Sequence, residues 1–246
     1  MSIFAYVEGP ADPGWRLSPV GWDGSQLVAD IGCGNGFELR QLVPEGRCRH
    51  AIGIDLSAGM LRTLDDLRGS GRLTILQGDA QQLPLADDSL DVAMAMHMLY
   101  HVPHMDAAVR ELRRIVRPGG TVLASTNSTG SLSEIHGLLN NALSEHLGHT
   151  AEALPALTFT TEAGAAALEH EFPEVTLHRN ELSLAFPHAQ PVRDYLDSLR
   201  EPILAHVGEP VDFDAVLDEV CARVEAVVTA DGCFQDAFRS GVFACR

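Results

Sequence analysis

The chain has 246 residues, 46% of them hydrophobic, and a formal net charge of −17. Its length fits one large domain, or one domain with a substantial insertion. The acidity argues against nucleic acid and anionic membranes as partners, because both are bound through basic patches. No run of eighteen apolar residues occurs, so no membrane span is expected. Five cysteines without a C-x-x-C pair, and no basic leader before an apolar run, predict reduced thiols and a cytoplasmic protein.

The predicted elements alternate regularly after an irregular arm over residues 1–26. We expect strands at Leu27–Ile31, His50–Asp55, Leu73–Gln77, Leu90–Met96 and Thr121–Ser125, and helices at Phe37–Leu42, Ala58–Leu67 and Met105–Val116. The last of these helices is expected to stop at Arg117-Pro118-Gly119-Gly120. Strands that alternate with helices indicate an α/β fold with a parallel sheet, which binds its ligands at the carboxyl ends of the strands.

Beyond Asn127 the pattern becomes mainly helical. We expect helices at Leu132–Leu147, Thr161–Glu169, Val192–Leu199 and Phe213–Val228, and strands at Val175–Phe186 and Gly241–Cys245. We interpret residues 27–129 as a nucleoside-binding core and 130–160 as a helical cap inserted over the site. Residues 161–246 would complete the sheet and the substrate pocket. Such caps exclude water and shape the pocket.

A glycine-rich turn is the strongest local signal. The apolar run from Val28 leads into Asp30-Ile-Gly-Cys-Gly-Asn-Gly36, and Asp55 ends the next strand nineteen residues after Gly36. Glycines let the backbone approach a ligand, and a carboxylate at this place accepts from ribose hydroxyls. The spacing is G-x-G-x-G rather than the dinucleotide G-x-G-x-x-G. Asp30 would repel a phosphate and hold an ammonium group, which favours S-adenosylmethionine. A ligand-free turn is the alternative, and the absence of lysine excludes a P-loop.

Four motifs in order resemble the class I S-adenosylmethionine-dependent methyltransferases of the type 11, small-molecule kind. They are Asp30–Gly36, Gly53-Ile-Asp-Leu-Ser57 with Met60, Gly78-Asp-Ala80 with Leu83-Pro84, and Glu111-Leu-Arg-Arg-Ile-Val-Arg-Pro-Gly-Gly120. The resemblance covers about residues 27–127. It implies a three-layer, Rossmann-like, seven-stranded and mostly parallel sheet with helices on both faces. It also implies S-adenosylmethionine as the cofactor and S-adenosylhomocysteine as its product.

The same resemblance implies roles for single residues in holding the cofactor. The methionine part would contact Asp30, the backbone of Gly32, Cys33 and Gly34, the carbonyl of His97 and, from the arm, Arg16. The adenosine part would contact Asp55 through the ribose, Leu56 and Met60 beside the adenine, and Asp79 and Ala80 at the ring edge.

Histidines just beyond the fourth strand are the candidates for catalysis. Methyl transfer is an in-line displacement that needs alignment, and it needs a base only if the nucleophile arrives protonated. We expect His101 first as that base, with His97 and Tyr100 as further candidates; a packing or cofactor-shell role is the alternative. A zinc site with His104 is not expected, because Pro103 interrupts the helical spacing and no carboxylate pair accompanies the histidines.

The acceptor is expected to be a small metabolite or natural-product intermediate, methylated on oxygen, nitrogen or carbon. Tyr6, His104, Asn127 and His136 are the candidate substrate contacts. Enzymes that methylate the amino groups of adenine or glutamine have an N/D-P-P-Y motif after the fourth strand, where this chain has Met94-Ala-Met-His97. The Pro-Cys nucleophile of cytosine C5 methylation is also absent there, so neither substrate class is expected. An NAD-linked oxidoreductase and a non-catalytic binding module are the alternative functions. A homodimer stays open.

Overall fold

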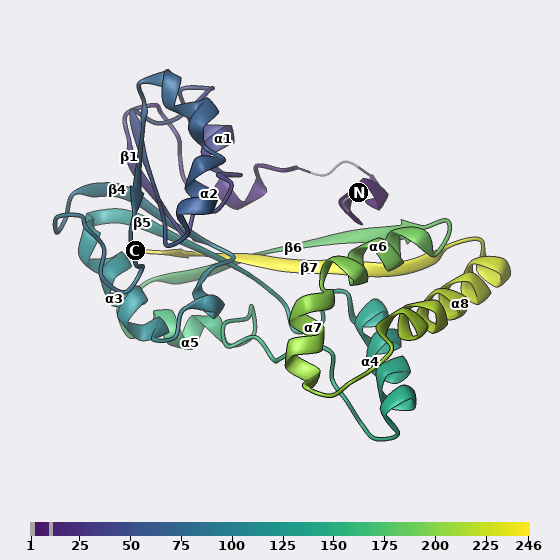
Figure 1. The fold of residues 1–246 in the computed structure, drawn as a ribbon. Coiled ribbons are helices and arrows are strands. Elements are labelled where there is room, and N and C mark those ends of the chain that lie inside the picture. The colour runs from purple at the N-terminus through teal and green to yellow at the C-terminus, as the bar shows by residue number, and fades with distance from the viewer. Residues whose placement is uncertain (1–2, 10–11) are drawn as a thin grey trace. The chain divides into compact units, whose positions relative to one another are not determined.

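The computed structural model describes residues 3–9 and 12–246, which form two compact units (Figure 1). Unit 1 comprises the described part of Met1–Ala11 together with Thr129–Leu157 and Asn180–Arg239. Unit 2 comprises Asp12–Ser128, Thr158–Arg179 and Ser240–Arg246. In the part of the chain described, no helix has both the length and the apolar character that crossing a bilayer requires.

A seven-stranded sheet carries the fold, with the strand order β3-β2-β1-β4-β5-β7-β6. The strands β3, β2, β1, β4 and β5 pair in parallel, whereas β7 pairs antiparallel to β5. This agrees with the expected Rossmann-like, mostly parallel sheet. The strand bounds are β1 Leu27–Ile31, β2 His50–Asp55, β3 Leu73–Gln77, β4 Leu90–Met96, β5 Val116–Asn127, β6 Val175–Phe186 and β7 Phe234–Cys245.

In unit 2 the two faces of the sheet bury separate cores. Helices α3 (Met105–Ile115) and α5 (Gly164–Leu168) pack on one face, where α3 buries Val109 and Leu112. Helices α1 (Leu39–Leu42) and α2 (Ala58–Arg62), with the short 3₁₀ helix η2 (Trp15–Leu17), pack on the other. Alternate residues of each central strand therefore point into different cores. The three-layer arrangement expected from the sequence is confirmed in this unit.

One expectation about β5 was wrong. The strand begins at Val116, not at Thr121, and so includes Arg117-Pro118-Gly119-Gly120. The register against β4 shifts between Leu90 and Val92, so these four residues form an irregularity within the strand. Proline and glycine are tolerated at such bulges, since a bulged residue gives up its place in the hydrogen-bond ladder. The helix α3 ends at Ile115, close to the predicted end, but Arg117-Pro118-Gly119-Gly120 lies within β5 and not before it.

Unit 1 buries a helical core of its own, in which α4 and α6 both pack against α8. The bounds are α4 Ser133–Leu147, α6 Gln190–Ser198, α7 Arg200–Val207 and α8 Phe213–Asp231. The helix α7 was not predicted. It follows α6 across the single residue Leu199, and Pro202 lies in its first turn, where a missing backbone donor costs nothing.

Other element boundaries also differ from expectation, and three of them concern α2, α5 and β7. The helix predicted over Ala58–Leu67 ends at Arg62 and is followed by the 3₁₀ helix η3 (Asp65–Ser70). The helix predicted over Thr161–Glu169 is confined to α5. The last strand starts at Phe234, seven residues before the predicted Gly241, and its residues 234–239 belong to unit 1.

Candidate functional site

A cavity of about 220 Å³ lies in unit 2 at the carboxyl ends of β1 and β4. In a parallel sheet this edge is where ligands bind. The cavity is lined by residues from η2, the glycine turn, the start of α1 and the end of β4: Arg16, Asp30, Gly32, Cys33, Gly34, Asn35, Phe37, Glu38, Met96 and His97.

The glycine turn is tied to the next strand by hydrogen bonds. The backbone N–H of Gly34 donates to Oδ2 of Asp55 at 2.8 Å, and the N–H of Ser57 donates to its Oδ1 at 2.8 Å. Cys33 donates its N–H to the carbonyl of Ile54 at 3.0 Å. The carboxylate of Asp55 is therefore fixed at the mouth of the turn, and each oxygen keeps a lone pair for a further donor.

The carboxyl group of Asp30 is buried in this cavity without a partner. Only 1% of the residue is exposed, and neither oxygen has a hydrogen-bond partner among the described residues. Burial raises the pKa of Asp30 well above its ordinary value, and the charges of Glu38 and Asp55 raise it further. A buried, unpaired carboxyl group is costly. A cationic ligand group in the cavity would satisfy it.

Arg16 places a cation in the same cavity. Its guanidinium lies 2.8 Å from Oε1 of Glu38 and stacks 5.1 Å from the ring centroid of Phe37. The Arg16 and Glu38 side chains are only 16% and 8% exposed, so this ion pair is more than a solvated surface contact. Glu38 and Phe37 were not predicted as site residues from the sequence. The available signal was their position directly after the glycine turn.

His97 is held in a strained conformation at the end of β4. Its φ is +52°, a region that non-glycine residues rarely adopt. Its backbone N–H donates to both the carbonyl and the hydroxyl of Ser125, each at 3.1 Å. Burial, helped by the positive charge of Arg16, lowers the pKa of His97 to about 4. The imidazole is therefore neutral at pH 7. Strain of this kind is often concentrated at functional sites.

The residues expected to surround adenine lie at the ends of β2 and β3. Leu56 is 69% exposed and Met60 is 48% exposed, so both present apolar surface that nothing covers among the described residues. The carboxylate of Asp79 accepts from the backbone and side chain of Gln81, and these bonds lower its pKa. Ala80 lies between Asp79 and Gln81 in the sequence. Gln81 was not predicted as a site residue, and its N–H groups fill acceptor positions of the Asp79 carboxylate.

The other predicted catalytic residues follow His97 in a short turn. The rings of Tyr100 and His101 are in tilted contact with centroids 4.5 Å apart, and burial raises the pKa of Tyr100. His101 is exposed, and His104 donates its backbone N–H to Gln81 at 3.2 Å. Throughout residues 3–9 and 12–246, no three histidine, cysteine or acidic side chains converge as a metal site would require.

The predicted substrate contacts fall in both units. Asn127 ends β5 in unit 2. Tyr6 and His136 belong to unit 1, where Tyr6 packs 5.4 Å from Phe186 and the His136 ring nitrogen lies 3.2 Å from the Tyr195 hydroxyl. Burial lowers the pKa of His136. The structure does not test these assignments, and they stay predictions.

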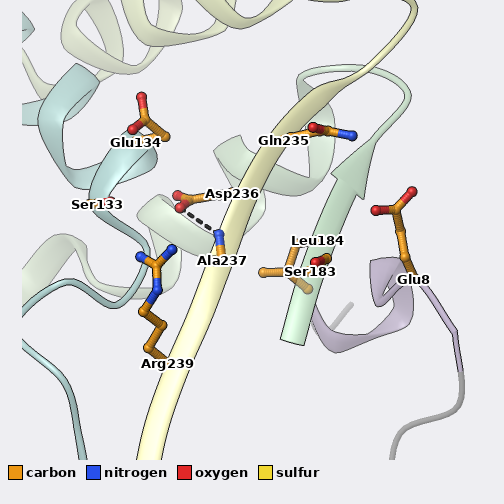
Figure 2. Close-up of a pocket in the computed structure, with 9 residues that line it drawn as sticks. All are labelled: Glu8, Ser133, Glu134, Ser183, Leu184, Gln235, Asp236, Ala237 and Arg239. Atoms are coloured by element: carbon orange, nitrogen blue, oxygen red, sulfur yellow. Dashed lines mark hydrogen bonds between the residues drawn. The ribbon is translucent and has the colours of Figure 1, made fainter. Parts of the chain in front are cut away.

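A second cavity, of about 260 Å³, lies in unit 1 (Figure 2). Asp236 is its most buried charged residue, and its carboxylate accepts from the N–H groups of Ala237 at 2.7 Å and Ile135 at 2.9 Å. The second bond caps the N-terminal end of α4. Arg239 donates to the carbonyl of Gly130 and pairs with Glu181. These bonds indicate that the polar residues of this cavity hold the first turn of α4 in place.

The sheet order and the glycine turn together define a Rossmann-like, nucleoside-binding α/β protein. A family model described as "Methyltransferase domain" matches residues 29–124. The ubiquinone/menaquinone biosynthesis C-methyltransferase UbiE of Syntrophotalea carbinolica is 30% identical over 166 residues, which cover 59% of this chain and 70% of that protein. The chain belongs to the class I S-adenosylmethionine-dependent methyltransferase family.

Two further comparisons limit how much family membership says about the substrate of this chain. The malonyl-[acyl-carrier protein] O-methyltransferase of Serratia marcescens is 33% identical over 162 residues, covering 65% of this chain and 60% of that protein. A Bacillus halodurans protein of known crystal structure aligns with a TM-score of 0.64 at 19% identity, over 96% of this chain and 98% of its own. The latter shows the fold alone. The chain spans 40% to 60% of the malonyl-[acyl-carrier protein] O-methyltransferases it matches.

Proposed function

We propose that the chain transfers the methyl group of S-adenosylmethionine to a small molecule. The observation that carries this proposal is Asp30, whose buried carboxyl group has no partner among residues 3–9 and 12–246 and lies in a cavity that also contains a cation, Arg16. A free amino acid end presents an ammonium and a carboxylate together. Asp30 is suited to the first and Arg16 to the second. A pyrophosphate would instead face three carboxyl groups, those of Asp30, Glu38 and Asp55, which disfavours NAD.

The residues at the other end of the site suit a nucleoside. Asp55, held by Gly34 and Ser57, offers lone pairs to the ribose hydroxyls. Leu56 and Met60 offer apolar surface to a base, and Asp79 offers an acceptor to an exocyclic amine. Binding of adenine at Asp79 would replace the hydrogen bond from the Gln81 side chain.

When bound, S-adenosylmethionine supplies a methyl group on a sulfonium, and the electron pair of the broken C–S bond stays on sulfur. The new bond is made by a lone pair of the acceptor, which loses one proton. The protein's own contribution is alignment of donor and acceptor and exclusion of water. We propose His101 as the base, with Tyr100 in contact with its ring. His97 is a further candidate but a weaker proton acceptor, because burial lowers its pKa to about 4.

Calorimetry with S-adenosylhomocysteine tests the cofactor assignment directly. We expect one ligand per chain with micromolar affinity or tighter, which is about −8 kcal/mol. NADH in the same cell is the matched control and should not bind. Absence of S-adenosylhomocysteine binding, or tighter binding of NADH, would overturn the proposal. Release of S-adenosylhomocysteine from a metabolite extract, followed by mass spectrometry, then identifies the acceptor by its added methyl group.

The segments outside the cofactor site are proposed to contribute the acceptor pocket. Residues 130–160 are proposed as a cap, and Tyr6, His104, Asn127 and His136 as acceptor contacts. Support for this comes from their residue types and from the position of Asn127 at the carboxyl end of β5. A metabolite or natural-product intermediate of modest size is the proposed substrate class.

A further inference from the structure

Two buried polar atoms outside the cofactor cavity also lack partners among the described residues. They are Oδ1 of Asn127 and Oγ of Ser240. Asn127 is the last residue of β5, and Ser240 lies directly opposite it on the antiparallel strand β7. Directly opposed residues project to the same face, with Cβ atoms about 5 Å apart. The two unpartnered atoms therefore belong to neighbouring side chains.

The pair lies on the face of the sheet that carries the cofactor cavity. Leu123 of β5 and Val242 of β7 belong to the core beneath α1 and α2. Asn127 and Ser240 are an even number of residues from them and so point to the same face. Met96, which lines the cofactor cavity, belongs to that core and pairs with Ser125. Strand spacing and rise place Asn127 roughly 8 Å from Met96.

Both backbones at this position are fixed. Asn127 accepts the N–H of Thr161 at 3.1 Å through its carbonyl, and the pair Asn127–Ser240 is the last of the β5–β7 ladder. Ser240 is only 3% exposed. Buried polar groups are satisfied in the large majority of cases, so two orphaned atoms at one strand pair indicate a missing partner.

We propose that Asn127 and Ser240 bind the hydroxyl group of the methyl acceptor. This inference rests on the proposed methyltransferase function and names the substrate class for that site. An amide oxygen only accepts, so its partner must donate a hydrogen, and a serine hydroxyl donates to the lone pair that remains. A hydroxyl meets both demands. An ionised carboxylate has no hydrogen to give and would leave Asn127 Oδ1 unsatisfied, so the pair disfavours carboxylates and suits a neutral alcohol or phenol.

The test compares phenol with its methyl ether, anisole, as probes of the intact protein saturated with S-adenosylhomocysteine. Ligand-observed NMR titrations give both affinities. We expect phenol to bind about five- to tenfold more tightly than anisole, as one or two added hydrogen bonds allow. The preference should fall to about onefold in Asn127→Leu and in Ser240→Ala. The control Ser198→Ala, at an exposed serine of α6, should keep it. Equal binding of the two probes, or no phenol binding, would overturn the inference.

Thermal unfolding without ligand separates this role from a purely structural one. A water molecule bridging the two atoms would also satisfy them. If the atoms await a ligand, apolar replacement should leave the unfolding temperature unchanged or raise it by about 2–4 °C. A fall in both variants, with the phenol preference intact, would show a structural water and overturn the inference. Failure of the wild-type protein to bind S-adenosylhomocysteine would instead overturn the proposed function, whatever the affinities of phenol and anisole.

Discussion

The backbone N–H of Gly34 donates to Oδ2 of Asp55 at 2.8 Å, so the two parts of the nucleoside signal in the sequence are bonded to each other. The contact joins the turn after β1 to the end of β2. It sets the orientation of the carboxylate before any ligand arrives. Preorganisation of this kind lowers the ordering cost of binding.

Replacing Asp55 should weaken S-adenosylhomocysteine binding severely. Asp55→Ala removes the proposed acceptor of two ribose hydroxyls, each bond to a charged group contributing about 1.5–3 kcal/mol, so calorimetry should show a loss of roughly 100-fold or more. Asp55→Asn keeps one oxygen and should lose less. The control is Asp65→Ala, which removes an exposed carboxylate paired with Arg68. An affinity equal to wild type in Asp55→Ala would contradict the ribose assignment.

Binding of the ammonium group should release a proton from Asp30. Because burial raises its pKa, the free carboxyl group carries a proton over a window above the ordinary value, and a bound cation favours its ionised form. Calorimetry over a series of pH values above the ordinary value of an aspartate, in two buffers of different ionisation enthalpy, should show a release of up to about one proton. The release should vanish in Asp30→Asn. It should also vanish with 5′-methylthioadenosine, which has no ammonium group; a release that persists there would have another source.

Acid should destabilise the protein through His97. Its pKa is about 4 in the folded chain and about 6.5 in the unfolded chain, so between these values the unfolded state binds more protons. Stability therefore falls as the pH falls through that window, by about 2 kcal/mol from pH 7 to 5. His97→Asn, chosen because asparagine tolerates a positive φ, should remove this part of the loss. Urea unfolding at both pH values measures it, and an unchanged pH dependence would refute it.

Two glycines of the turn should respond differently to alanine. At Gly36, where φ is +73°, a Cβ would collide with the buried Leu64, so Gly36→Ala should destabilise the fold by about 2–4 kcal/mol. At Gly34, where φ is +52°, nothing lies within 4 Å of the added atom. Gly34→Ala should cost only about 1 kcal/mol of stability but reduce cofactor affinity. Similar unfolding temperatures for the two variants would contradict this distinction.

Arg16 should strengthen the binding only of ligands that carry a carboxylate. Arg16→Ala should weaken S-adenosylhomocysteine roughly tenfold and leave 5′-methylthioadenosine unchanged, because one charge-assisted contact is lost. Glu38→Gln is the companion variant. It removes the intramolecular competitor for Arg16 and should strengthen S-adenosylhomocysteine binding. Equal losses for both ligands in Arg16→Ala would indicate that the residue only supports the cavity wall.

The core of the fold could be predicted because its signals are local. Four of the five parallel strands have the bounds expected from apolar runs, since a buried strand must be apolar and short. The first residue of β5 and the early part of β7 could not be predicted. The start of β5 depends on the register shift beside Leu90, and β7 belongs to the sheet through β5 residues more than a hundred positions earlier in the sequence.

The sequence by itself determined the α/β class, the glycine turn and the carboxylates Asp30 and Asp55. Each of these features is recognised from a short stretch of the chain. Only the tertiary structure decided which of these groups lacks a partner. In the described part of the chain Asp30 has no partner while Asp55 and Asp79 are bonded, and packing alone brings Glu38 and Ser240 to these positions. Burial and hydrogen bonding depend on contacts between distant segments, and no local pattern contains them.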